Sequence, residues 1–191
     1  MRFFTLETKK EQLDKFLEFW GQFYHNNNTK QYKKYINQDE LDQRQLELFS
    51  KWRNNSENLN QAKQAVWGQV EGKIELLNEF RQQEKVNLKR FRDEFGFLRP
   101  RWLIYLLHWA SPKKYPIFDQ YTFTAQRYIQ FQTLEELPYQ DKIIERFYFN
   151  HFVPDFYRQL NKKDLSGLQI YQGLASFGKF LIRLTELEDN Y

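Results

Sequence analysis

The stretch Trp102-Leu-Ile-Tyr-Leu-Leu-His-Trp-Ala110 is apolar on every side of a helix except at His108. A helix at a protein surface keeps one polar face, so this stretch predicts a helix that other helices surround. It is too short to cross a membrane, which takes about 20 apolar residues. Ser111-Pro112 ends it, because proline cannot continue a helix. We therefore expect a helical core to be built around this segment.

The rest of the chain also shows helical periodicity. Apolar residues recur at spacings of three and four in nearly every segment, and the 191 residues include only 7 glycines and 5 prolines. Strands are not expected. The pattern predicts about eight helices, over residues 8–25, 39–52, 59–83, 88–95, 102–110, 120–130, 139–153 and 164–182. We expect a single all-α domain spanning residues 1–191, which could be divided into two helical lobes.

Short polar residues mark several of the predicted helix ends. Thr8, Asp119 and Asp164 each precede a helical stripe, where their side chains could accept hydrogen bonds from the free N–H groups of the first turn. Gly96 follows the predicted short helix 88–95 and is expected to end it in the left-handed conformation. Pro154 is expected to break or restart the helix that contains it.

Composition excludes several classes of function. The chain has no cysteine, so it has no disulfide and no thiolate metal site. Its histidines His25, His108 and His151 are isolated, whereas helical metal ligands usually come in pairs one turn apart, so no metal is expected. No cluster of glycines suggests a phosphate-binding loop, so no nucleotide cofactor is expected. The first residues lack the apolar run of a signal peptide, which predicts a cytoplasmic protein.

Charge and aromatic content leave the ligand open. Lys and Arg number 29 against 25 Asp and Glu, a formal net charge of +4 that permits binding to phosphate without requiring it. Aromatic residues make up 19% of the chain. They could stack on nucleic-acid bases or fill a bulky core, and the core is the more economical interpretation.

Residues 95–131 contain a recognisable pattern. Gly96-Phe-Leu-Arg-Pro-Arg101 opens the apolar helix, and Tyr115-Pro-Ile-Phe-Asp119 leads into the next one. This arrangement resembles the core of the helix-hairpin-helix DNA glycosylase superfamily, in which a glycine-containing hairpin begins an apolar helix and an aspartate before the next helix is catalytic. The family hairpin usually has two glycines, whereas this chain has only Gly96. The resemblance implies a DNA-binding protein of DNA repair.

The resemblance also implies roles for particular residues. Asp119 would be the catalytic carboxylate, and Arg101 lies where some family members have a catalytic lysine. Because an arginine stays protonated and cannot form a Schiff base, the enzyme would be a monofunctional glycosylase without strand cleavage. The expected DNA contacts are the basic residues on either side of the apolar helix and on the next helix, namely Arg99, Arg101, Lys113, Lys114 and Arg127. The candidates for stacking on a flipped base are Trp109, Tyr115 and Phe118.

A second interpretation explains the same residues without catalysis. Asp119 would then serve only as a helix cap, and the aromatic residues would form the core. The chain would be a helical module that binds another protein or itself through an apolar surface. The sequence leaves open which interpretation applies and whether the chain is an enzyme.

Overall fold

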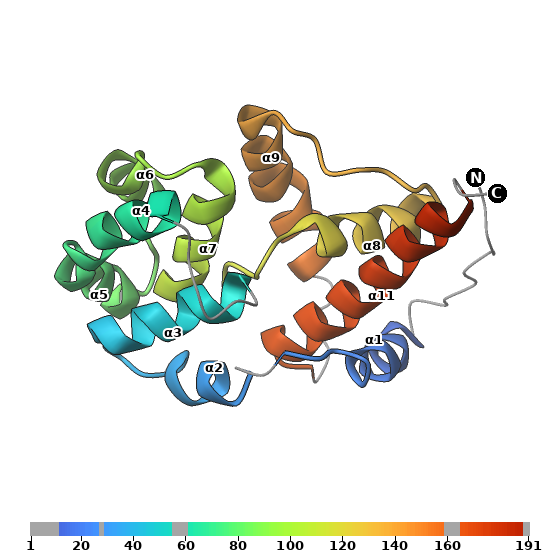
Figure 1. The fold of residues 1–191 in the computed structure, drawn as a ribbon, viewed down its shortest axis with the longest axis horizontal. Coiled ribbons are helices and arrows are strands. Elements are labelled where there is room, and N and C mark those ends of the chain that lie inside the picture. Colours follow the sequence, from blue (N-terminus) through green and yellow to red (C-terminus); the bar gives the residue numbers. More distant parts are fainter. Residues whose placement is uncertain (1–11, 27–28, 55–60, 159–164, 189–191) are drawn as a thin grey trace. The chain divides into compact units, whose positions relative to one another are not determined.

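The computed structural model describes residues 12–26, 29–54, 61–158 and 165–188. These residues form ten α-helices and one π-helix, and they contain no strand (Figure 1). The prediction of an all-α fold is confirmed. The predicted caps Thr8 and Asp164 lie outside the described residues.

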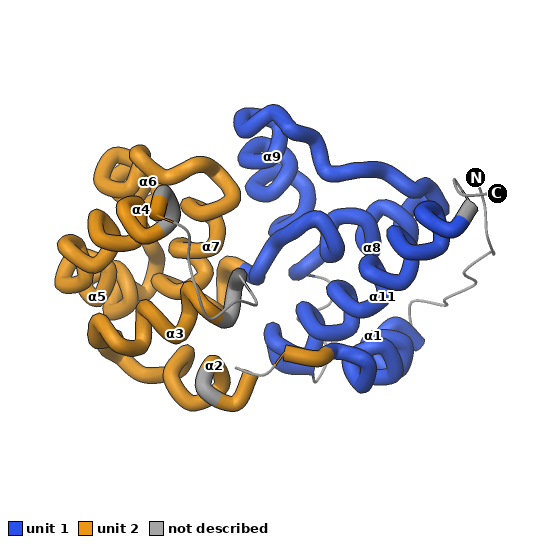
Figure 2. The backbone as a smooth tube through the Cα atoms, in the orientation of Figure 1, with its two compact units in different colours: residues 1–24, 116–191 blue, residues 25–115 orange. Residues whose placement is uncertain are grey.

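The chain divides into two compact units (Figure 2). Unit 1 combines residues 1–24 with residues 116–191, and unit 2 is the continuous segment 25–115. In unit 1 the structure describes α1 (Leu13–Gly21), α8 (Gln120–Phe131), α9 (Asp141–Phe147), η2 (Tyr148–Tyr157) and α11 (Gly167–Glu188). In unit 2 it describes α2 (Thr29–Tyr35), α3 (Gln43–Asn54), α4 (Gln61–Glu71), α5 (Ile74–Gln82), α6 (Leu88–Phe95) and α7 (Pro100–Ala110).

Helix α11 organises unit 1, because it packs against both α1 and α8 (Figure 1). Two glycines permit this close approach. A Cβ on Gly173 would lie 2.5 Å from the carbonyl oxygen of Leu17 in α1, and a Cβ on Gly178 would lie 1.9 Å from that of Tyr121 in α8. Neither distance is sterically possible, so both contacts require glycine.

The helix that contains Pro154 is not interrupted there, contrary to the prediction. Pro154 lies inside the π-helix η2, which follows α9 directly. In an α-helix the proline ring would clash with the carbonyl group four residues earlier. The wider turn of a π-helix relieves this crowding, and π-helical segments are uncommon in proteins.

Helix α7 is the centre of unit 2, as predicted. Every residue from Leu103 to Ala110 is buried, and α5 and α6 pack against the helix. Its polar residue His108 is accommodated by two hydrogen bonds. The Nδ1 atom donates to the carbonyl oxygen of Tyr115 at 2.6 Å, and Nε2 therefore accepts from the hydroxyl of Tyr32. Burial is the main cause that lowers the pKa of His108 to about 4.

Several predicted boundaries were wrong. The helix predicted over 59–83 is two helices, α4 and α5, separated at Gly72-Lys73, and α2 was not predicted at all. Gly96 is not left-handed, since its φ is −65°. It is needed because a Cβ there would lie 2.7 Å from the carbonyl oxygen of Arg92. None of the described helices is both long and apolar enough to cross a membrane.

Candidate functional site

Asp119 caps α8 and is buried, with 7% of its surface exposed. Its Oδ1 atom accepts from the backbone N–H of Thr122 at 2.9 Å, and its own N–H donates to the Thr122 hydroxyl at 2.9 Å. This reciprocal pair is a capping box. The Oδ2 atom accepts from the hydroxyl of Tyr171 in α11 at 3.0 Å. Both carboxylate oxygens therefore have partners within unit 1, as the cap interpretation expects.

The three aromatic residues named as stacking candidates lie inside the cores of the two units. Trp109 is 0% exposed, Tyr115 9% and Phe118 2%. Trp109 contacts the rings of Phe49 and Tyr105 in unit 2. A base could stack on these rings only if the core around them opened.

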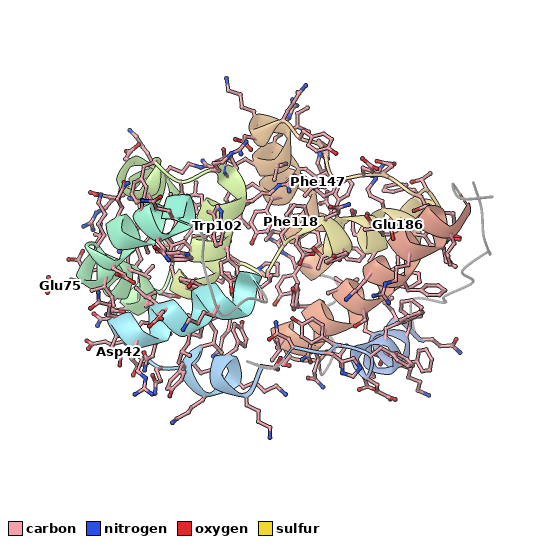
Figure 3. All side chains as sticks on the ribbon, in the orientation of Figure 1. Asp42, Glu75, Trp102, Phe118, Phe147 and Glu186 are labelled. Carbon is pink, nitrogen blue, oxygen red and sulfur yellow. The ribbon has the colours of Figure 1, made fainter. Side chains whose placement is uncertain are left out.

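Phe118 shows how completely such a ring is surrounded. It lies in unit 1 and contacts the rings of Phe123, Phe147, Tyr148 and Phe152. Figure 3 shows the side chains of Phe118 and Phe147 close together, and their ring centroids are 6.0 Å apart. Phe118 lies just before α8 in the sequence, and its ring is therefore part of the core of unit 1.

Arg127 is used within unit 1. Its guanidinium bonds twice to the carboxylate of Glu135, at 2.9 Å and 2.6 Å, and lies 4.3 Å from the ring centroid of Phe131. Hydrogen bonding from Arg127 is the main cause that lowers the pKa of Glu135. The charge of Arg127 is thus compensated by a neighbour on the loop that follows α8.

The other four predicted basic residues lie in unit 2, at the two ends of α7. Arg99 and Arg101 are at its N-terminal end, where Arg99 is exposed and Arg101 is half-buried. Lys113 and Lys114 are exposed and follow its C-terminal end. The helix has 11 residues, which corresponds to a length of roughly 16 Å. The four residues therefore form two pairs rather than one cluster.

Helix α6 and the residues before it add basic side chains that are not among the predicted DNA contacts. Lys85 precedes the helix, Lys89 and Arg92 belong to it, and all three are exposed. The segment 111–115 lies beside this region, because Lys114 donates to the carbonyl oxygen of Glu84. Burial raises the pKa of the Tyr115 hydroxyl, and the positive charge of Arg92 on α6 opposes this shift. Arg92 therefore lies near Tyr115. The pair at the C-terminal end of α7, Lys113 and Lys114, thus lies next to α6.

A simple count of charge along the sequence would have found this region. Residues 81–115 contain nine Lys or Arg and three Asp or Glu, a net charge of +6, while the whole chain carries only +4. We call residues 81–115 the basic segment. Two of its arginines serve the fold or a neighbour: Arg81 donates to backbone carbonyls, including that of Ile36, and Arg90 pairs with Glu79 at 2.9 Å.

The described residues hold no group of three or more side chains that could bind a metal ion. His151 lies 3.5 Å from Asp155, as an exposed pair on η2. No family model matches the chain, and neither a curated protein nor a solved structure matches it.

Proposed function

We propose that this chain binds DNA through the basic segment, residues 81–115. The observation that carries the proposal is the concentration of charge, since this segment has a net charge of +6 and the remainder of the chain is slightly acidic. Lysine and arginine side chains neutralise phosphates and release bound counterions, which is the main source of affinity for DNA. Exposed basic residues come from α6 and from both ends of α7, which pack against each other in unit 2.

Contacts of this kind position a protein on DNA without reading its sequence. We therefore expect binding that depends weakly on base sequence and strongly on salt concentration. The logarithm of the binding constant should fall linearly with the logarithm of the salt concentration, with a slope set by the number of phosphates contacted.

The test replaces Lys113 and Lys114 together with alanine. Both side chains are exposed, but the change also removes the hydrogen bond from Lys114 to the carbonyl oxygen of Glu84, so thermal unfolding of the variant checks that the fold is intact. If both contact phosphates, the salt slope should decrease by up to about 2. The matched control is the replacement of Lys33 and Lys34, two adjacent exposed lysines of α2 in the same unit but outside the basic segment. An equal decrease in both double variants would mean that net charge, rather than this surface, attracts DNA.

The resemblance to the glycosylases adds base excision by Asp119 to this proposal. Its support is the position of the carboxylate at the N-terminus of α8, within the segment 95–131 that resembles the family. A carboxylate there could stabilise the positive charge that develops on a sugar when its base leaves. The reaction requires substrate to reach a side chain that is 7% exposed.

A second candidate is a non-catalytic interaction module, and the exposed aromatic face formed by α1 and the turn that follows it favours this candidate. Phe19 and Phe23 are each 53% exposed. Their rings contact each other and Trp20, which in turn contacts Phe180 of α11. Sedimentation at increasing protein concentration tests self-association through this face, and replacement of Phe19 and Phe23 with serine should abolish it. A monomer at all concentrations would count against self-association.

A further inference from the structure

The turn between α6 and α7 carries an exposed aromatic ring inside the basic segment. Phe97 is 40% exposed. Among the side chains that the structure describes in unit 2, it is the only large hydrophobic one that is exposed; all the others of this kind are in unit 1. A single exposed phenylalanine at this place therefore distinguishes the basic segment from the rest of its unit.

The position of Phe97 is fixed by its neighbours. Phe95 and Leu98 on either side are buried, and the N–H of Leu98 donates to the carbonyl oxygen of Phe95 at 2.9 Å. Gly96 allows the close approach to Arg92 that this turn requires. Two anchored residues thus hold the turn, so Phe97 is presented at the surface without being part of the core.

One cationic side chain lies beside the ring, and two more follow it in the sequence. The ammonium group of Lys73 lies 5.9 Å from the centroid of Phe97, and it is held there by the carboxylate of Glu94 at 2.9 Å. Since Glu94 compensates this charge, Lys73 orders the ring rather than adding to the phosphate contacts. Arg99 and Arg101 follow Phe97 directly in the sequence, at the N-terminal end of α7.

An exposed aromatic ring next to basic side chains suits an unpaired base with its phosphates. Aromatic side chains bind single strands by stacking on bases, while lysine and arginine follow the backbone. In a duplex both faces of each internal base are already stacked, so the ring gains nothing there. We infer that Phe97 is a stacking platform for an unpaired base, so that the basic segment prefers single-stranded DNA to duplex. This inference rests on the proposed function.

The experiment measures fluorescence anisotropy of a labelled oligothymidine and of a labelled duplex of the same length. The wild-type chain should bind the single strand more tightly. Phe97→Ala should weaken single-strand binding by roughly 5- to 150-fold, the usual effect of losing one stacked base. Duplex affinity and both salt slopes should stay unchanged, because no phosphate contact is removed.

Three further variants test whether binding depends on stacking by the Phe97 ring, on the size of its side chain, or on any exposed aromatic residue. Phe97→Tyr retains an aromatic face and should bind like the wild type, whereas Phe97→Leu retains apolar bulk and should bind like Phe97→Ala. Tyr139→Ala is the control, because Tyr139 is an aromatic residue of unit 1 that is 83% exposed. Thermal unfolding of each variant checks that the fold is intact.

The outcomes distinguish this inference from the proposed function. Equal losses on single strand and duplex, an unchanged Phe97→Ala variant, or a Phe97→Leu variant that binds like the wild type would each overturn the stacking role. The proposed function would survive all three results. Absence of binding to either DNA at low salt would overturn both.

Discussion

Asp119 caps a helix in the structure, and the proposed excision reaction gives it a catalytic role as well. A substitution can separate these two roles. Asparagine is as good a helix cap as aspartate, and its amide N–H can donate to the Tyr171 oxygen instead of accepting from it, so Asp119→Asn should lower the free energy of unfolding by no more than about 1 kcal/mol. If the carboxylate stabilises charge during base excision, the same variant should excise bases slower by orders of magnitude. The measurement is base release, without strand cleavage, from duplexes with damaged or mismatched bases.

Asp119→Ala is the companion variant, because it removes the cap as well as the charge and should cost about 1 kcal/mol or more. Full excision by a folded Asp119→Asn chain would contradict the catalytic role. If the wild-type chain excises none of a broad panel of bases, the resemblance concerns fold alone, which does not imply function.

His108 should make the stability of unit 2 depend on pH. Its pKa is lowered from 6.5 to about 4 in the folded chain, so below pH 6.5 the unfolded chain binds the proton more readily. The stability that the neutral ring contributes is complete above pH 6.5 and is lost as the pH falls towards 4. We expect the free energy of unfolding to be lower by about 2 kcal/mol at pH 5 than at pH 7.

Urea unfolding at the two pH values measures this difference. His108→Gln can keep hydrogen bonds to Tyr32 and Tyr115 but does not titrate, so it should remove most of the pH dependence. The matched control is His151→Gln, since His151 is exposed on η2 and its loss should leave the pH dependence in place. A wild-type chain that is equally stable at both pH values would show that His108 can be protonated without cost.

At the scale of the helices, the contact between α11 and α8 depends on one missing methyl group. Gly178→Ala would place a Cβ 1.9 Å from the carbonyl oxygen of Tyr121, so the two helices must move apart. Such overpacking should lower the free energy of unfolding by about 3 kcal/mol. Gly68→Ala is the control, because its Cβ would have no atom within 4 Å and alanine favours a helix interior by about 0.5–1 kcal/mol. Equal effects of the two changes would contradict the role of close packing.

The sequence predicts elements well where hydrophobicity and periodicity agree. Helix α7 was found because its residues are apolar all round, and the cap at Asp119 was found because capping is local. The break at Gly72-Lys73 was missed because Val70 and Ile74 continue one helical stripe across it. Helix α2 was missed because its segment, Thr29–Tyr35, is mostly polar. What anchors Tyr32 there is His108, 76 residues further along, and a local pattern does not contain that contact.

In the candidate site, too, the sequence predicts local features but not those that depend on tertiary contacts. The basic residues beside α7 could be found from the sequence, since charge is visible there. The burial of Trp109 was expected from the apolar helix that contains it, but the sequence could not exclude a stacking role for Trp109 or Phe118, because an aromatic residue of a core and an aromatic residue of a binding surface have the same local signature. The contribution of α6 depends on the segment 111–115 folding back beside it, which is a tertiary contact.

At the scale of the whole molecule, the prediction of a single domain implies that the two units unfold cooperatively. A single domain should unfold in one transition that different probes report at the same temperature. The Gly178→Ala variant makes the test specific, because it weakens unit 1 only. If the two units unfold together, the entire transition should move to lower temperature. Two separated transitions, of which only one moves, would show that the units are independent; far-ultraviolet circular dichroism during heating measures this.

The discontinuous course of unit 1 has a consequence during synthesis on the ribosome. Helix α1 is made early, but its partner α11 lies beyond residue 166, and unit 2 is translated in between. At about 5–20 residues per second, α1 emerges several seconds before α11 exists. Throughout that interval the nascent chain exposes Phe16 and Trp20, whose rings later contact Phe177. Unit 2 is therefore complete on the ribosome before unit 1, whose first helix must wait for α11 before its aromatic side chains can be buried.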